Sequence, residues 1–292
     1  MAIRPDWLRV RAPTPAQAAG IRAVRAVLSR HGLHTVCQEA LCPNAVECWG
    51  ARTATFMILG NVCTRSCRFC GVPTGDPGGR VDESEPRRLA DAIVELGLKY
   101  VVLTSVDRDD LEDGGAELFA KSVELVKQAK PDVRVETLIP DFSGDPRALN
   151  RVLSSGADVF GHNLETVRSL SAELRDRRAS YEQSLTILGY LRASEKRRDA
   201  RVKSGLMVGL GETRGDIQRT FADLREVGVD TLTIGQYLRP SAQATPVVRF
   251  IPPEEFDELA SEARDHGFRS VVAGPLVRSS YHASEAYEEG CD

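Results

Sequence analysis

Short apolar runs and amphipathic stretches alternate along the chain from residue 54 onward. The apolar runs are five to seven residues long and comprise Thr55–Leu59, Tyr100–Thr104, Val133–Ile139, Ala157–Gly161, Val202–Val208 and Thr231–Gly235. Such runs predict β-strands. The stretches between them carry apolar residues at helical spacing and predict helices over Pro86–Gly97, Ala116–Ala129, Pro146–Ser154, Tyr181–Ala193, Thr213–Val227 and Glu254–His266.

A strand followed repeatedly by a helix indicates parallel βα units. Six such units in about 200 residues predict an α/β fold, a partial (β/α)6 barrel of the TIM type. In such a barrel the active site gathers at the carboxyl ends of the strands. A doubly wound open sheet has the same alternation, so the pattern alone leaves that architecture open.

The two ends of the chain have a different texture. Residues 15–31 carry apolar side chains at helical spacing and predict an amphipathic helix, after which an irregular segment follows. At the other end, the apolar run Ser270–Ala273 leads into Gly-Pro-Leu-Val and then Arg278–Tyr281. We therefore divide the chain into an N-terminal extension (1–53), a barrel (54–268) and a C-terminal segment (269–292).

Composition narrows the class of protein. The chain has 292 residues, of which 42% are hydrophobic and 27% charged, a balance typical of a globular fold. Its net charge of −4, without a stripe of basic residues, gives no indication of nucleic-acid binding. The short cluster Lys196–Arg198 is interpreted as a solvated helix end or loop.

The sequence also bears on the location of the protein. It starts without the apolar stretch of a signal peptide, and no apolar run approaches the roughly 20 residues that span a bilayer. We expect a soluble protein of the reducing cytoplasm. The seven cysteines are therefore read as metal-binding or catalytic before they are read as disulfides.

Cys63, Cys67 and Cys70, the second triad, have the spacing C-x3-C-x2-C directly after the first predicted strand. Thiolates on a tight loop are the usual ligands of iron–sulfur clusters. When three thiolates bind a cluster of four irons, one iron has no protein ligand. In radical chemistry driven by S-adenosylmethionine, that iron binds the cofactor, which is then cleaved to a carbon radical. A structural zinc site closes at four ligands, and this loop offers no fourth cysteine or histidine. The spacing predicts a radical-generating cluster.

Cys37, Cys42 and Cys48, the first triad, have the spacing C-x4-C-x5-C upstream of the barrel. Three cysteines within twelve residues favour a second cluster over free buried thiols, which behave as small hydrophobes. A single six-cysteine site is disfavoured because the predicted strand between the triads separates the two loops. Cys291 lies outside both triads and is interpreted as a free thiol.

Both triads lie in segments that resemble lipoyl synthase, a family of radical enzymes that use S-adenosylmethionine. The resemblance runs from about Arg4 to Ala286, and its most specific part is the pair of triads together with Arg278–Tyr281. The segments that carry it are Cys37–Asn44, Glu47–Gly50, Thr53–Gly60, Cys63–Cys70, Leu103–Leu111, Val135–Phe142, His162–Val167, Lys203–Glu212, Gly235–Leu238 and Gly274–Ala283.

The resemblance implies insertion of two sulfur atoms, at carbons 6 and 8, into an octanoyl chain held on a lysine of a lipoyl carrier domain. By this likeness the second triad holds the radical-generating 4Fe–4S cluster. The first triad holds an auxiliary 4Fe–4S cluster that is consumed as the sulfur donor. The expected partners are an octanoylated carrier, either the H protein of glycine cleavage or the lipoyl domain of a dehydrogenase, and an electron donor such as ferredoxin or flavodoxin. We expect a monomer.

The resemblance also supplies a fourth ligand for the auxiliary cluster. It assigns this role to the serine after Arg278, which is Ser279, with Ser280 as the alternative if the register differs. Two adjacent serines on their own would indicate a turn or a helix cap. A hard alkoxide suits a soft sulfide cluster less well than a thiolate, so this iron would be the easiest to release. We expect Arg278 to favour the deprotonated serine.

Polar residues at the predicted strand ends are candidates to bind S-adenosylmethionine. They are Thr104, Ser105, Glu136, Asn163, Glu165 and Arg178, with Lys203 and Gln236 marking later strand ends. Such residues can also simply cap helices or satisfy loop backbone. The chain reads Arg175–Ala179 where many relatives have a proline, which leaves the alignment of these arginines open by a residue or two. We assign no catalytic role to any histidine.

Two other functions fit part of the pattern. A radical enzyme whose second cluster only transfers electrons would leave that cluster intact after turnover. A non-catalytic iron–sulfur electron carrier would not respond to S-adenosylmethionine, and it would not need a chain of barrel size.

Overall fold

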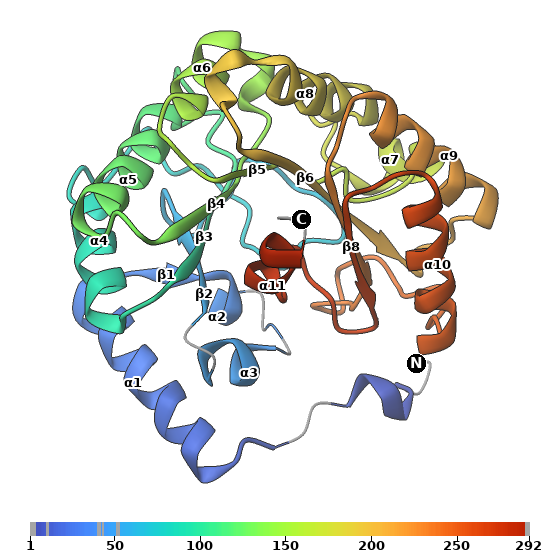
Figure 1. Ribbon diagram of the computed structural model, residues 1–292, viewed down its shortest axis with the longest axis horizontal. Coiled ribbons are helices and arrows are strands. Elements are labelled where there is room, and N and C mark those ends of the chain that lie inside the picture. The colour runs from blue at the N-terminus through green and yellow to red at the C-terminus, as the bar shows by residue number, and fades with distance from the viewer. Residues whose placement is uncertain (1–3, 10–11, 40–41, 43, 51–52, 290–292) are drawn as a thin grey trace.

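A single eight-stranded sheet curls around a central space and carries helices on its outside (Figure 1). The computed structural model describes residues 4–9, 12–39, 42, 44–50 and 53–289. Strands β2 to β8 pair in parallel and in sequence order, and the short β1 pairs antiparallel with β2. The strands are β1 (His34–Thr35), β2 (Ala54–Ile58), β3 (Tyr100–Ser105), β4 (Arg134–Leu138), β5 (Val159–Gly161), β6 (Arg201–Val208), β7 (Thr231–Gln236) and β8 (Ser270–Gly274).

The predicted α/β partial barrel is confirmed. A doubly wound sheet reverses its strand order part-way, whereas this sheet runs without reversal from β1 to β8. It is one parallel strand longer than the six that we predicted. The apolar run Ser270–Ala273 was assigned to the C-terminal segment, but it forms β8 and pairs with β7. No long amphipathic stretch follows this run in the sequence, so the strand-then-helix pattern does not count it as a further unit.

The helices follow the predicted amphipathic stretches closely. The main ones are α1 (Pro15–His31), α4 (Glu85–Leu96), α5 (Ala116–Ala129), α6 (Pro146–Leu153), α8 (Tyr181–Ala193), α9 (Arg214–Glu226) and α10 (Pro253–Asp265). Shorter helices that the pattern did not predict are α2 (Val36–Glu39), α3 (Ala45–Gly50), α7 (Arg168–Leu174) and α11 (Ala283–Glu289). In the described ranges no helix is both long enough and apolar enough to span a bilayer.

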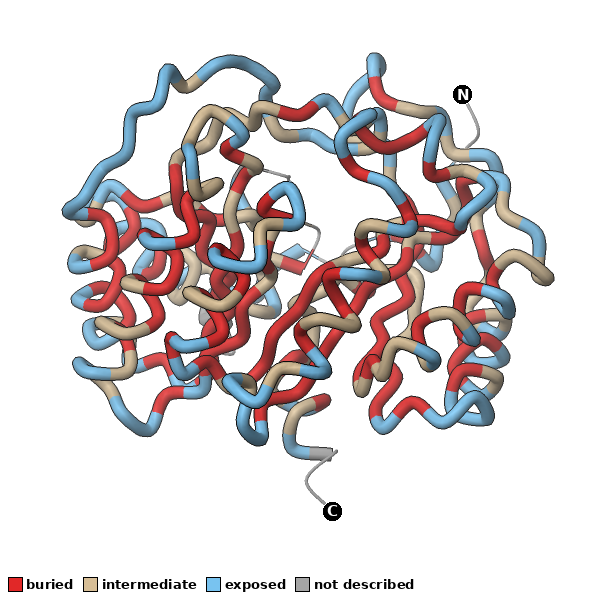
Figure 2. The backbone as a smooth tube through the Cα atoms, turned by 90° about the horizontal axis from the view of Figure 1, so that it is seen from above, coloured by how far each residue is buried: buried red, intermediate tan, exposed pale blue. Residues whose placement is uncertain are grey.

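Local chemistry fixes where the first long helix starts. The amide of Gln17 donates to the Thr14 hydroxyl at 3.3 Å, and the Thr14 amide donates back to the Gln17 side chain at 2.9 Å. This capping box, with Pro15 at the first helical position, satisfies amides that the helix itself leaves unpaired. Figure 2 shows the resulting pattern of burial, with buried strands inside and exposed residues along the outer faces of the helices.

The chain beyond β8 turns back toward the amino ends of the strands. The Val277 carbonyl lies against Gly235 near the end of β7. Ala283 then packs with Tyr100, the first residue of β3, and the Arg201 guanidinium lies 4.4 Å from the ring of Tyr287. In Figure 1 helix α11 accordingly lies inside the curve of the sheet. The C-terminal segment therefore crosses the central space and fills its lower part.

Candidate metal and cofactor site

A cavity of about 700 Å³ opens at the carboxyl ends of the strands. This volume is within the range of pockets that bind small molecules and cofactors. Two cysteines of the first triad and all three of the second line it: Cys37, Cys42, Cys63, Cys67 and Cys70. Cysteines of both triads therefore face one space, although the intervening strand β2 separates the triads in sequence.

The second triad lies on the loop that follows β2. The amide of Cys63 donates to the Pro73 carbonyl at 2.9 Å, and the Cys63 carbonyl accepts from Gly75 at 2.9 Å, so the loop is closed at its base. Each sulfur also accepts a hydrogen bond from a backbone amide. Cys63 accepts from Arg65 at 3.4 Å, Cys67 from Asp176 at 3.3 Å and Cys70 from Val72 at 3.5 Å. These amides partly offset the burial that raises the pKa of all three thiols.

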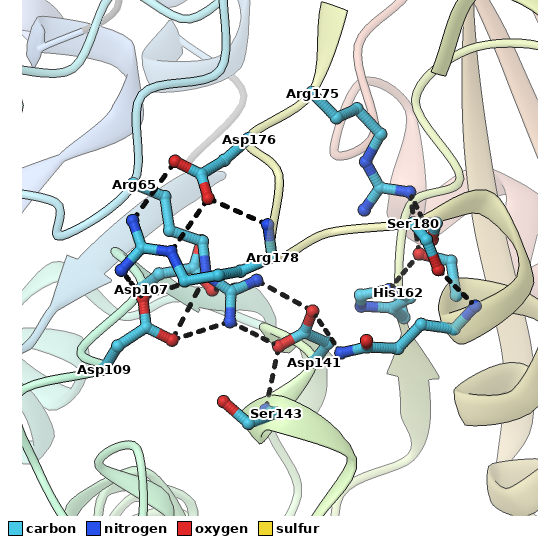
Figure 3. Close-up of polar contacts among 12 residues, drawn as sticks. Arg65, Asp107, Asp109, Asp141, Ser143, His162, Arg175, Asp176, Arg178 and Ser180 are labelled. Carbon is cyan, nitrogen blue, oxygen red and sulfur yellow. Dashed lines mark hydrogen bonds and ion pairs between the residues drawn. The ribbon is translucent and has the colours of Figure 1, made fainter. Parts of the chain in front are cut away.

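Arg65 anchors this loop from within (Figure 3). Its guanidinium donates to Asp141 at 2.7 and 2.8 Å and to Asp109 at 2.7 to 3.2 Å, and it lies 3.3 Å from Asp107. The arginine side chain is only 4% exposed. Planar guanidinium groups bind carboxylates in this two-point fashion with defined geometry. Because Arg65 lies between Cys63 and Cys67, the carboxylates fix the loop that carries both cysteines.

The first triad lies on the segment that precedes β2. A hydrogen bond from the Cys37 thiol lowers the pKa of Cys42 to about 6, and the same contact, together with burial, raises the pKa of Cys37. Burial raises the pKa of Cys48 to about 12, and this residue, like Cys37, packs against the hydrophobic core. The Asn44 side chain donates to the Leu276 carbonyl at 2.6 Å. The first triad is thus attached to the C-terminal segment.

The donor sets fit clusters better than a single metal ion. Ligands of one tetrahedral zinc ion lie about 3.8 Å from one another, as zinc–sulfur distances of about 2.3 Å require. In the ranges that the structure describes, no three Cys, His, Asp or Glu side chains converge on one such ion. The thiolates of a 4Fe–4S cluster lie farther apart, because each one binds its own iron. The second triad provides three soft sulfur donors on one loop, and each sulfur accepts a hydrogen bond from a backbone amide.

The two serines of the C-terminal segment also line the cavity. The Ser279 hydroxyl accepts a hydrogen bond from the Asn163 amide at 2.7 Å, and the Ser280 hydroxyl accepts one from Thr55 at 2.7 Å. The guanidinium of Arg278 donates to the carbonyls of Gln236 and Val277, and its charge helps to lower the pKa of Cys42. The positive charge of Arg278 therefore acts on the first triad, next to the serines.

Four of the six expected cofactor contacts line the cavity: Thr104, Ser105, Asn163 and Glu165. The Thr104 hydroxyl donates to the Leu138 carbonyl at 2.9 Å. Within the described chain, the buried Ser105 hydroxyl has no hydrogen-bond partner, which leaves it available to a ligand. Burial raises the pKa of Glu165, whose carboxylate accepts from Asn163 at 3.1 Å and whose backbone has φ of 70°. Such strained backbone clusters at binding sites.

The other two expected contacts lie elsewhere. Glu136 lies one layer deeper in the barrel, where Lys203 donates to it at 2.8 and 3.0 Å and Tyr100 donates to it at 2.7 Å. Arg178 lies behind the cysteine loop, where it donates to Asp176 at 2.8 Å (Figure 3). Both residues have protein partners that account for their charge.

Comparison with known proteins identifies the family. Residues 57–224 match the radical SAM superfamily. The lipoyl synthase of Deinococcus radiodurans is 52% identical over 282 residues, covering 97% of this chain and 84% of that protein. That of Pyrobaculum calidifontis is 54% identical over 287 residues, covering 98% and 96%. The chain belongs to the lipoyl synthase family. Membership implies S-adenosylmethionine and a 4Fe–4S cluster as cofactors.

Solved structures share the fold. HydG, a maturase of the [FeFe]-hydrogenase, has a TM-score of 0.55 at 15% identity, covering 88% of this chain and 55% of that chain. SuiB from Streptococcus suis, bound to its precursor peptide, has a TM-score of 0.56 at 12% identity, covering 91% and 54%. At identities this low, these two structures support the fold of the chain alone.

The structure also shows site residues that the sequence did not single out. Arg175 lines the cavity and donates to the Ser180 carbonyl at 3.1 Å and to the Ser184 hydroxyl at 2.9 Å. It is three residues before Arg178, within the segment Arg175–Ala179. The sequence alone leaves open which arginine of this segment faces the site. His162, to which we assign no catalytic role, is buried, and its ring nitrogens lie 2.9 Å from the Ile139 carbonyl and 2.9 Å from the Ser184 hydroxyl.

Proposed function

We propose that this chain inserts two sulfur atoms, at carbons 6 and 8, into an octanoyl chain on a lysine of a lipoyl carrier domain. The auxiliary cluster on the first triad is the sulfur-donating substrate and is consumed in turnover. The carrier is the H protein of glycine cleavage or the lipoyl domain of a dehydrogenase. The ferredoxin or flavodoxin donor, the monomeric state and the cytoplasmic location stay predictions.

The observation that supports this proposal best is that two cysteines of the first triad, all three of the second and both serines line one cavity in a chain of this family. A sulfur donor can react with a carbon radical only if both reach the same point of the substrate. A cavity between the two triads allows that approach, whereas two separate pockets would not.

The chain's own residues would bind and orient the reactants. The second triad would hold the cluster, and Ser105, Asn163 and Glu165 would contact S-adenosylmethionine. When bound, these two cofactors supply a carbon radical that removes a hydrogen atom from an unactivated methylene group. The acyl chain would lie along the apolar part of the cavity wall, which includes Met57, Leu138, Ile139, Leu206 and Met207.

The first triad would hold the sulfur-donating cluster, with Ser279 as its fourth ligand. The Asn163 amide donates to the Ser279 hydroxyl at 2.7 Å, and a serine oxygen that bound iron would give up its own proton and would still have a lone pair to accept this hydrogen bond. Ser280 lies on the same cavity with its own partner, Thr55, and stays the alternative. A serine oxygen is a weaker ligand for a soft cluster than a thiolate, so this corner is suited to release iron.

The test is a single turnover after anaerobic reconstitution, with an octanoyl-lysine peptide as substrate. Mass spectrometry should find a product with two added sulfurs, at no more than one equivalent per enzyme. Ser279→Ala should not form this product, whereas the exposed control Ser154→Ala should match the wild type. A doubly thiolated product from Ser279→Ala would reject that serine as the fourth ligand, and loss in Ser280→Ala alone would move the assignment there.

The same experiment separates the rival functions. Iron and sulfide are counted before and after one turnover, and the proposal expects both to fall as product forms. Unchanged counts with a formed product would indicate a second cluster that only transfers electrons. A cluster spectrum that does not respond to S-adenosylmethionine would indicate an electron carrier instead.

A further inference from the structure

Two glycines on neighbouring strands lie where the C-terminal segment enters the barrel. They are Gly205 on β6 and Gly235 on β7, and the register pairs Gly205 with Thr233 and Met207 with Gly235. Both face the cavity that the triads share. Glycine weakens a strand interior, so its presence there often marks a close approach by another part of the backbone.

Gly235 is in direct contact with the C-terminal segment. A Cβ carbon at this position would lie 2.2 Å from the Val277 carbonyl oxygen and 3.1 Å from the carbonyl carbon. The obstacle is backbone, so a rotamer change cannot relieve it. The carbonyl would have to retreat by about 0.8 Å to reach even 3.0 Å, below which Cβ contacts essentially do not occur.

The next two residues along the segment are Arg278 and Ser279. Arg278 donates to the Val277 carbonyl at 2.6 Å and to the Gln236 carbonyl, next to Gly235, at 3.3 Å. The contact at Gly235 therefore determines how deep the whole Val277–Ser279 stretch lies. Metal ligands must be held within about 0.5 Å of their productive position, which is less than the displacement a side chain at 235 would impose.

We infer that Gly235 is a positioning residue of the auxiliary site. Its missing side chain allows the Val277 carbonyl to lie against β7, and this contact places Ser279 at the cavity. The inference rests on the proposed function insofar as Ser279 is taken as the fourth ligand. Gly205 has the related role for the partner of this serine, since a Cβ there would lie 2.7 Å from the Asn163 side-chain oxygen.

The experiment isolates the auxiliary cluster. In a full-length chain whose second triad is replaced by alanine, the first triad holds the only cluster, so iron per chain reports it directly. Gly235→Ala in this background should lower the iron content from about four to about three or fewer, the loss also expected for Ser279→Ala. In the converse background, a full-length chain whose first triad is replaced by alanine, Gly235→Ala should keep about four irons per chain, because the loop of the second triad is unchanged.

Gly20→Ala is the matched control, because a Cβ there meets nothing within 4 Å, and it should retain all its iron. If Gly235→Ala does not fold, as judged by its thermal melt, Gly274→Ala decides the question. Its Cβ would lie 3.2 Å from a Val277 methyl carbon, a milder clash from the other side, and should cause a smaller loss of iron.

The outcomes separate this inference from the proposed function. The role of Gly235 is overturned if Gly235→Ala keeps all its iron while Ser279→Ala loses iron. The same holds for Gly274→Ala if that variant decides the question. In both cases Ser279 stays the proposed fourth ligand. Full iron in both Gly235→Ala and Ser279→Ala rejects the serine ligand itself. Loss of iron in both, with the iron of the second triad retained by Gly235→Ala in the converse background, supports the inference.

Discussion

Replacement of Arg65 tests how the radical-generating loop is held. Arg65→Met keeps much of the side-chain volume but removes the charge that three carboxylates share, those of Asp107, Asp109 and Asp141. Asp141 is 1% exposed and would be left as a buried carboxylate without its main partner. Burial already raises the pKa of Asp107 to about 6, and Arg65 opposes that shift. Without Arg65, some of this charge must be neutralised by protonation.

The expected cost follows from this burial. Removing one partner from a buried ion pair destabilises a protein by about 3–5 kcal/mol, largely because the other charge stays behind. Arg65→Met should therefore lose at least that range of unfolding free energy. Arg65→Lys should lose less, because a charge remains, but a single ammonium group cannot bind two carboxylates in the two-point geometry. The loss should concentrate at the loop that carries Cys63 and Cys67.

The assay combines urea unfolding of the metal-free protein at pH 7 with iron analysis after reconstitution. In a background whose first triad is replaced by alanine, Arg65→Met should retain less than half of the wild-type iron. The control Arg147→Met removes an arginine that is 86% exposed and should cost less than about 1 kcal/mol. An Arg65→Met protein with wild-type stability and full iron would refute the argument that the carboxylates hold this loop.

Three further variants test the surrounding structure. Lys203→Met should cost about 3–5 kcal/mol in urea unfolding. Adding Glu136→Leu should recover part of that loss, since an apolar pair then replaces the buried ion pair, although the Tyr100 hydroxyl loses its acceptor. A double variant as unstable as the single one would contradict this. Burial lowers the pKa of His162 to about 4, so the unfolded chain binds this proton more readily and stability should fall by up to about 3 kcal/mol between pH 7 and pH 4. His162→Asn should flatten that acid dependence, and an unchanged slope would exclude His162 as its source. Thr14→Ala should cost about 1 kcal/mol through loss of the capping box with Gln17, seen as a lower melting temperature.

The fold could be predicted well because its signals are local. The stretches Ala116–Ala129 and Tyr181–Ala193 coincide with helices α5 and α8, whose apolar residues repeat at helical spacing over three turns or more. The cysteine spacings likewise single out both triads, because each set lies within a few residues of chain, and their role as cluster ligands stays a prediction. The contact between Gly235 and Val277 has no such local signal, since it depends on how distant segments pack.

Register and burial explain the expected contacts that lie elsewhere. Glu136 and Leu138 share the inward face of β4, but two residues along a strand correspond to about 6.6 Å, so Leu138 reaches the cavity and Glu136 lies below it. Arg175 and Arg178 lie three residues apart in one charged segment. The structure shows that Arg175 is 8% exposed and faces the cavity. The Arg178 side chain is 42% exposed. The sequence gives the order of the residue types, but it does not show how deeply each side chain is buried in the fold.

The two triads differ in how much of the chain they need. The loop of the second triad closes at its base between Cys63 and Gly75, and its more distant contacts come from within the barrel, such as those with Asp141 and Thr245. The first triad depends on contacts between the two ends of the chain, since Asn44 bonds to Leu276, 232 residues away, and Thr55 bonds to Ser280, 225 residues away. Closing such long loops costs entropy that only the completed barrel can offset. The site that would hold the consumable cluster is therefore the one that joins the two ends of the chain, and we expect a shift of the C-terminal segment to disturb it more than the radical-generating loop.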